Sequence, residues 1–105
     1  MSAGPVRLLN LMRAREDRAA EVEQIALAMI ARSESVGCCI RGELLRDLRD
    51  PDELAVLWHF VSEEQLEQFL REDWRNDALE KLPELIELDV RRQIFEAVVA
   101  PTATS

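Results

Sequence analysis

The chain has 105 residues and a net charge of −8, with 21 acidic against 13 basic residues. This length fits one small domain, which we place at residues 1–100, followed by a flexible C-terminal tail at residues 101–105. A domain of this size often needs oligomerisation for stability. The negative charge repels phosphate backbones and anionic lipids, so we expect neither nucleic acid nor a membrane as a partner.

The first third of the chain fits either one long helix or a strand followed by a helix. Two sets of residues alternate between positions 6 and 13, and one set consists of Val6, Leu8, Asn10 and Met12. This alternation favours the strand. Asp17 stands where an N-cap would begin the helix, Val22 belongs to its apolar stripe, and Gly37 suits the left-handed position that ends it.

Cys38 and Cys39 are adjacent in the sequence. Neighbouring residues of an extended segment point to opposite sides, so a disulfide between them would be strained. We expect two buried, reduced thiols and a cytoplasmic protein, and a redox or metal-binding thiol pair is the alternative. No apolar run reaches the ~18 residues of a membrane span, and residues 1–5 lack the charged and apolar parts of a signal peptide.

Residues 39–48 and 54–61 are predicted to pair as a hairpin across the turn at residues 49–52. This Pro- and Asp-rich turn initiates an apolar run whose length and aromatic content suit a buried strand. Ser62 and Gln65 have the S-x-x-Q spacing of a capping box, which predicts a helix directly after the strand. A strand that leads into a helix excludes an all-helical fold.

The second helix is predicted to break near Glu72 and to resume through Trp74, and Pro83 either stops it or begins another short turn. Residues 90–99 alternate well enough to form a last strand. The resulting order is strand, helix, strand, strand, helix, strand. This order is the split βαβ arrangement of a ferredoxin-like α+β fold.

Several short motifs follow one another along the chain: Gly37-Cys38-Cys39 before Arg41-Gly42-Glu43-Leu44, Arg46-Asp47 with Asp50-Pro51, Phe60 before Ser62-Glu63-Glu64, a closing helix Leu79 to Ile86, and Asp89-Val90-Arg91-Arg92. In their order and spacing, from about Val6 to Val99, the chain resembles the antibiotic biosynthesis monooxygenase (ABM) family of dimeric α+β barrel proteins. The resemblance implies a four-stranded antiparallel sheet with two helices on one face. It also implies a homodimer, in which the other face packs against a second subunit.

Members of this family with known activity oxidise phenolic or quinol-type aromatic compounds with O2, without metal or flavin. The resemblance therefore implies a cofactor-independent monooxygenase of an electron-rich aromatic small molecule, with no cofactor and no metal. A related branch degrades haem. That branch has tryptophan at the position of Phe69 and an iron-ligating histidine near Ala78 and Leu79, where this chain has none, so we do not expect haem degradation.

Asn10 is the candidate catalytic residue. An amide between Leu8 and Met12 on one apolar face of a strand is out of place there. Its hydrogen bond would stabilise a phenolate or ring radical that passes an electron to oxygen, and the haem-degrading branch carries an asparagine at this strand position. The alternative is an asparagine that bonds to the backbone at a strand edge.

Four aromatic side chains are predicted to wall a substrate pocket between the sheet and the helices: Trp58, Phe60, Phe69 and Trp74. The alternative is that they form a packed core. Arg41 is the candidate that would hold a carboxylate or phenolate in this pocket, with Arg91 and Arg92 as further candidates. Ion pairing at the surface is the alternative role of these arginines.

His59 is the only histidine of the chain, which excludes a multi-histidine metal site. It points away from Trp58 along the strand and is expected at the dimer seam, and a role as general base is its alternative. No other base is evident near Asn10. A second hypothesis therefore stays open, in which the protein is a non-catalytic dimeric module that binds a small molecule or serves as an accessory on the same scaffold.

Overall fold

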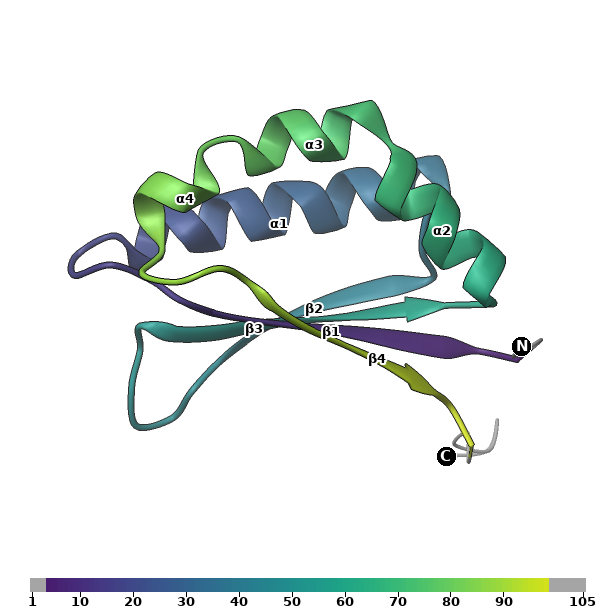
Figure 1. Cartoon of the computed structure of the whole chain (residues 1–105), viewed down its shortest axis with the longest axis horizontal. Coiled ribbons are helices and arrows are strands. Elements are labelled where there is room, and N and C mark those ends of the chain that lie inside the picture. Colours follow the sequence, from purple (N-terminus) through teal and green to yellow (C-terminus); the bar gives the residue numbers. More distant parts are fainter. Residues whose placement is uncertain (1–3, 99–105) are drawn as a thin grey trace.

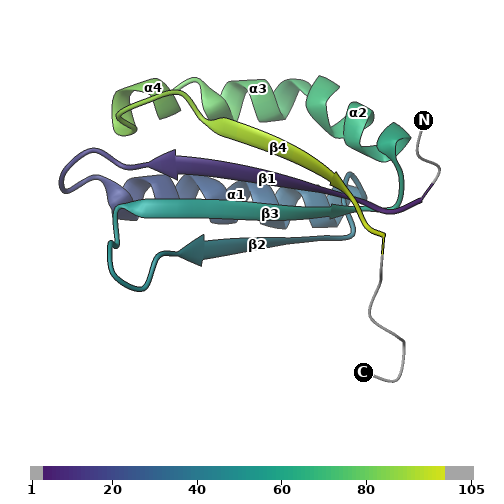
Figure 2. The ribbon, with the colours of Figure 1, turned by 60° about the horizontal axis from the view of Figure 1, so that its bottom comes forward.

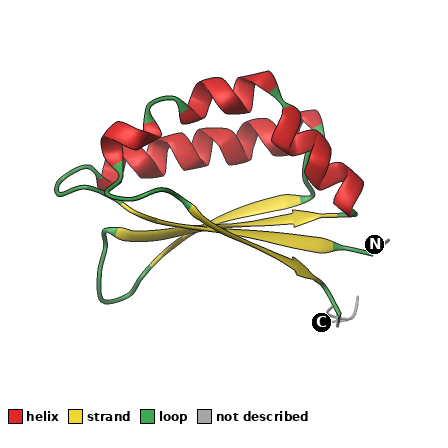
Figure 3. Cartoon of the chain, in the orientation of Figure 1, coloured by secondary structure: helices red, strands yellow, loops and turns green. Residues whose placement is uncertain are grey.

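The computed structural model describes residues 4–98. Four strands form one antiparallel sheet: β1 (Val6–Arg13), β2 (Arg41–Arg46), β3 (Glu53–Phe60) and β4 (Arg91–Glu96). The helices are α1 (Ala19–Val36), α2 (Glu63–Arg71), α3 (Asp73–Leu79) and α4 (Leu82–Leu85), and all four lie on one face of the sheet (Figures 1 and 3). The strand order β2-β3-β1-β4 confirms the predicted ferredoxin-like α+β fold.

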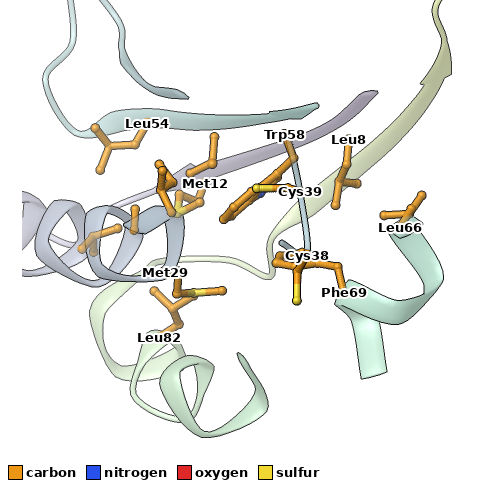
Figure 4. Packing of buried hydrophobic residues seen from close by; sticks show 14 of the residues in the cluster. Leu8, Met12, Met29, Cys38, Cys39, Leu54, Trp58, Leu66, Phe69 and Leu82 are labelled. Carbon is orange, nitrogen blue, oxygen red and sulfur yellow. The ribbon is translucent and has the colours of Figure 1, made fainter. Parts of the chain in front are cut away.

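The two faces of the sheet, which we call the covered face and the open face, follow the alternation of the strands. On the covered face Leu8 of β1 lies opposite Trp58 of β3, and both are almost fully buried. Side chains of this face and of the helices point into the layer between them (Figure 4). The open face carries the intervening residues, such as Leu57, and no described helix covers it (Figure 2).

Two glycines let α1 end and lie close to the sheet. Gly37 adopts a φ of 78° and closes α1, as predicted. Gly42 of β2 lies under α1, where an added Cβ would stand 2.8 Å from Cγ1 of Ile30. The missing side chain at this position therefore permits the close approach of helix and strand.

The predicted cap of α2 is confirmed. The backbone N–H of Gln65 donates to Oγ of Ser62 (3.2 Å). The Gln65 side chain returns a bond to the backbone N–H of Val61 (Oε1, 2.8 Å) rather than to that of Ser62, and it also donates to the carbonyl of Gly37 (3.0 Å). One side chain thus ties the start of α2 to the end of α1.

Three predicted details are wrong or need adjustment. Helix α1 begins at Ala19 after Arg18, so Asp17 is not its N-cap; Asp17 instead adopts a φ of 65° in the preceding turn, a conformation that short polar side chains tolerate. Strand β2 begins at Arg41, two residues later than predicted. The part of the second helix that resumes after Glu72 ends at Leu79 instead of continuing through Leu82, and α4 is a separate helix.

Other predictions hold within the described residues. The helical segment is interrupted at Glu72, between α2 and α3. Pro83 lies in the first turn of α4, where its missing N–H costs no intrahelical hydrogen bond. None of the described helices is long and apolar enough to cross a membrane. The predicted tail at residues 101–105 lies outside the described residues.

Candidate functional site

A small cavity lies between the covered face of the sheet and the helices. The volume in which the centre of a water molecule fits is about 50 Å³, so the cavity has room for more than one water. Most of its wall is apolar and comes from both layers: Met12, Val22, Ile25, Ala26, Met29, Val56, Leu79, Leu82 and Val90. Such a wall suits an apolar ligand, and the cavity must widen to admit an aromatic ring, since an apolar cavity that binds benzene has about 150 Å³.

Asn10 lies in the wall of this cavity. Its Oδ1 is buried and has no hydrogen-bond partner. The backbone-bonded asparagine that we considered as an alternative is therefore not observed for this oxygen. A buried polar atom without a partner is uncommon in folded proteins and calls for an explanation.

Two other residues of the cavity wall also carry buried atoms without partners, namely Nε1 of Trp58 and Nε of Arg75. Among the described residues there is one further atom of this kind, Oγ of Ser33 in α1, and Ser33 is not part of the wall. Three of the four unpartnered atoms thus gather around a single cavity.

Arg75 of α3 is the charged residue of the wall that lies deepest, with an exposed fraction of 6%. Its guanidinium carbon lies 5.1 Å from the centroid of the Phe69 ring, a cation–π distance. Nη1 makes one long bond of 3.5 Å to Oδ1 of Asn76. Burial and, secondarily, the charge of Arg92 lower the pKa of Arg75.

Arg92 reaches the same cavity from the edge strand β4. In the pairing of β4 with β1, Arg92 lies directly opposite Asn10, so both residues belong to the covered face. Among the described residues no carboxylate lies within ion-pair distance of Arg75 or Arg92. The cavity therefore carries two guanidinium groups and no counter-charge.

The predicted aromatic cluster forms around Phe69. Its ring centroid lies 4.7 Å from that of Trp58, 5.4 Å from that of Phe60 and 6.5 Å from that of Trp74. Trp58 and Phe69 line the cavity, whereas Phe60 and Trp74 do not. Trp74 instead lies under the guanidinium of Arg32, at 5.7 Å. The cluster is thus partly cavity wall and partly core.

The structure places Arg41 and His59 away from the cavity. They lie opposite each other on β2 and β3, on the open face. Both contact Glu43: a guanidinium nitrogen of Arg41 lies 3.5 Å from its carboxylate, and Nε2 of His59 lies 3.2 Å from it. Surface ion pairing, the alternative that we considered for Arg41, is the role the contacts show.

Arg75 is not among the site residues that the sequence predicts. The break at Glu72 separates α2 from α3, so the spacing from Phe69 to Arg75 follows no single helical period. Arg92 was a candidate, and the alternation of β4 together with its register would have placed it beside Asn10. No comparable signal in the sequence points to Arg75.

Both cysteines are free and buried, as predicted. Burial raises the pKa of Cys39 to about 11, and burial together with the neighbouring Glu72 raises the pKa of Cys38. Their thiolates, the reactive forms, are therefore disfavoured at neutral pH. Among residues 4–98, no three His, Cys, Asp or Glu side chains group in a way that could hold a metal ion.

The family model described as antibiotic biosynthesis monooxygenase matches residues 5–81. The chain therefore belongs to this family, as the sequence resemblance predicted. Helices α1 to α3, strands β1 to β3 and most of the cavity wall fall within the matched part.

Solved structures share the fold. A protein of Caulobacter crescentus, whose name carries the same family description, superposes with a TM-score of 0.85 at 18% identity over 92% of each chain. A similarly named protein of Nitrosomonas europaea gives 0.84 at 7% identity, over 93% of this chain and 94% of its own. A conserved protein of Methanosarcina mazei gives 0.82 at 18% identity, over 90% and 93%. No curated protein matches the sequence.

Proposed function

We propose that the protein is a cofactor-independent monooxygenase that oxidises an electron-rich phenol or quinol in the cavity on the covered face. The observation that carries this proposal is the buried, unpartnered Oδ1 of Asn10 in an apolar and aromatic wall. Membership of the ABM family supports it. A side-chain amide offers an acceptor and, after rotation, a donor from one position, so Asn10 suits a ring hydroxyl and the oxyanion derived from it.

The chemistry balances without an external reductant. A hydroquinone transfers an electron to O2, the ring radical and superoxide combine at a ring carbon, and loss of water leaves a hydroxyquinone. Hydroquinone plus O2 thus gives hydroxyquinone plus water, and all electrons come from the substrate. The role of Asn10 is to stabilise the charged ring oxygen, and the apolar wall keeps bulk water from the reacting pair.

We also infer that two copies of the chain pair through the open face. The face carries apolar side chains such as Leu9, Leu11 and Leu57, which are only half-buried in one chain. A set of partly exposed leucines on a sheet face that no described helix covers (Figure 2) is typical of an interface. Leu57→Asp should convert the dimer to a monomer in sedimentation velocity, whereas the same charge in the fully exposed loop residue Leu48 should leave the dimer intact.

A non-catalytic binding module is the second candidate. The described cavity wall contains no aspartate, glutamate or histidine that could act as a general base. A module of this kind would bind a ring compound through the same wall and leave it unchanged.

Oxygen uptake with a panel of hydroquinones separates the two candidates. We expect turnover that falls by about 10²-fold in Asn10→Ala, which is the size typical of losing one oxyanion hydrogen bond. Gln68→Ala, which removes an exposed amide from α2, should keep full activity. Binding of the hydroquinones without any oxygen uptake would establish the module instead.

A further inference from the structure

We propose that the cavity binds its ring ligand as an anion, with the charged oxygen of the ligand held between Arg75 and Arg92. The ring character of the ligand rests on the proposed function, whereas its charge follows from these two arginines alone. The ligand class is therefore an aromatic anion, either a phenolate or a ring carboxylate.

Arg75 has no counter-charge among the described residues. The chain has 21 acidic residues against 13 basic ones, yet none of the described carboxylates pairs with Arg75, a residue that is only 6% exposed. A buried charge without a counter-charge is strongly unfavourable and persists only where something offsets it. Arg75 belongs to the cavity wall, and its Nε is a hydrogen-bond donor without a partner. An anion in the cavity would provide both an acceptor for this donor and a counter-charge for the guanidinium.

Arg92 brings a second positive charge to the same cavity. Two guanidinium groups at one cavity repel each other, and the charge of Arg92 already lowers the pKa of Arg75. An anionic oxygen between them turns this repulsion into two charge-assisted hydrogen bonds, for which the planar guanidinium is well suited. No neutral ligand relieves the repulsion in this way.

The rest of the cavity wall also matches an aromatic anion. Trp58 offers one more unpartnered donor, Nε1, and almost all the remaining wall is apolar. A ligand that matches this wall has an apolar ring and a charged oxygen at one end. The wall offers no carboxylate that would repel such a ligand.

This arrangement also removes the difficulty of the missing base. A phenol that enters a site with two guanidinium groups loses its proton to solvent more readily, because the positive charges stabilise the phenolate. The bound phenolate is the electron-rich form that reacts with oxygen. The arginines would then perform by electrostatics what a general base performs by proton transfer.

Titration with 4-nitrophenol tests the proposal, because its neutral and ionised forms absorb at different wavelengths. We expect the wild-type protein to bind the phenolate and to lower the pKa of bound 4-nitrophenol by one unit or more. Arg92→Gln should weaken binding of the phenolate at least about tenfold, the fold-change for loss of one hydrogen bond to a charged group. Arg91→Gln, the neighbouring residue on the open face of β4, is the matched control and should leave binding of the phenolate unchanged, and sedimentation velocity checks that this variant keeps the dimer.

Benzoate and benzamide distinguish the two kinds of anion. Preference for benzoate over benzamide that disappears in Arg92→Gln assigns a carboxylate subsite, and a lowered pKa of 4-nitrophenol without this preference assigns a phenolate subsite. Arg75→Met repeats both measurements at the buried position. Since Arg92 is exposed on an edge strand, its variant is expected to fold even if the Arg75 variant does not, which circular dichroism checks.

Three results would overturn the proposal: equal binding of neutral and anionic probes, equal weakening in Arg91→Gln and Arg92→Gln, or binding of neither anion. The proposed monooxygenase activity fails separately. Selective anion binding without oxygen uptake by any hydroquinone refutes the activity and leaves the anion site standing. Oxygen uptake with neutral hydroquinones that is unaffected in Arg92→Gln refutes the anion site and leaves the activity standing.

Discussion

The two faces of the sheet differ in how their polar side chains are satisfied. On the open face, Arg13 donates to Asp50 (2.6 Å) and to Glu53 (2.9 Å), and His59 lies 3.2 Å from Glu43. On the covered face, the buried Oδ1 of Asn10 has no partner at all.

This difference runs against the usual cost of burial, because a missing partner costs more in the interior than near solvent. Among the described residues, three of the four buried side-chain atoms without a partner belong to residues of the cavity wall, where a bound molecule can reach them, and the fourth is Oγ of Ser33. The covered face thus holds groups that lower the stability of the empty protein, and the open face holds groups that stabilise it slightly.

The largest expected effect comes from the apolar part of the covered face. Trp58→Ala should lower the free energy of unfolding by about 3–5 kcal/mol, because it empties space beside Phe69 in the core. Urea denaturation measures the loss. Trp58→Phe keeps a ring against Phe69 and removes the unpartnered Nε1, so its cost should be clearly smaller. Equal costs for the two variants would mean that Nε1 has a partner in solution.

Arg75→Met should have the opposite sign. Methionine has a similar length and no charge, so the variant should gain about 1–3 kcal/mol in the free energy of unfolding, as when a buried ionic group is replaced by an apolar one. Lost stacking on Phe69 would offset part of this gain. Urea denaturation measures this change in the free energy of unfolding. A clear loss of stability would show that Arg75 supports the fold rather than a ligand.

Asn10→Leu should stabilise the protein by a smaller amount, about 1 kcal/mol, because an unsatisfied buried acceptor is replaced by an apolar group of similar size. Both variants are compared in the Leu57→Asp background, in which the open face is expected to be free of a partner copy. Gln93→Leu is then the matched change on the open face of β4, where the side chain is exposed in the single chain. It should alter stability by less than about 0.5 kcal/mol. If both variants change the free energy of unfolding by the same amount, the unpartnered acceptor on the covered face carries no energetic cost of its own.

The sequence predicts the fold well, because its signals are local. The alternation from Val6 to Met12, the cap at Ser62 and the left-handed Gly37 each determine one element, and together they define the strand and helix order. Asp17 misled the prediction since a short polar residue suits a helix N-cap and a left-handed turn equally well.

The site was harder to predict, because it is assembled from distant parts of the chain. Asn10 was identifiable as an amide among apolar neighbours on one strand face. Arg41 and Arg92 are similar in sequence terms, and only the pairing register places Arg92 opposite Asn10 and Arg41 opposite His59. Arg75 depends on how α3 is turned after the break at Glu72, which no pattern in the sequence determines.

The smallest expected effect tests the paired groups of the open face through pH. The bond from Arg13 holds the pKa of Asp50 below its ordinary value of 3.8. Because the pKa is lower in the folded than in the unfolded state, this pair stabilises the fold above pH 3.8 and loses its effect as the pH falls through the folded-state pKa.

Asp50→Asn should therefore melt slightly below the wild-type protein at neutral pH and at the same temperature in acid, as thermal denaturation across pH would show. Asp89→Asn, an exposed carboxylate on the loop before β4, should track the wild type throughout. Added salt should shrink the neutral-pH difference, since both partners of the pair are partly exposed to solvent. A difference that persists unchanged in acid would instead assign the role of Asp50 to its bond with the backbone of Asp52 in the turn.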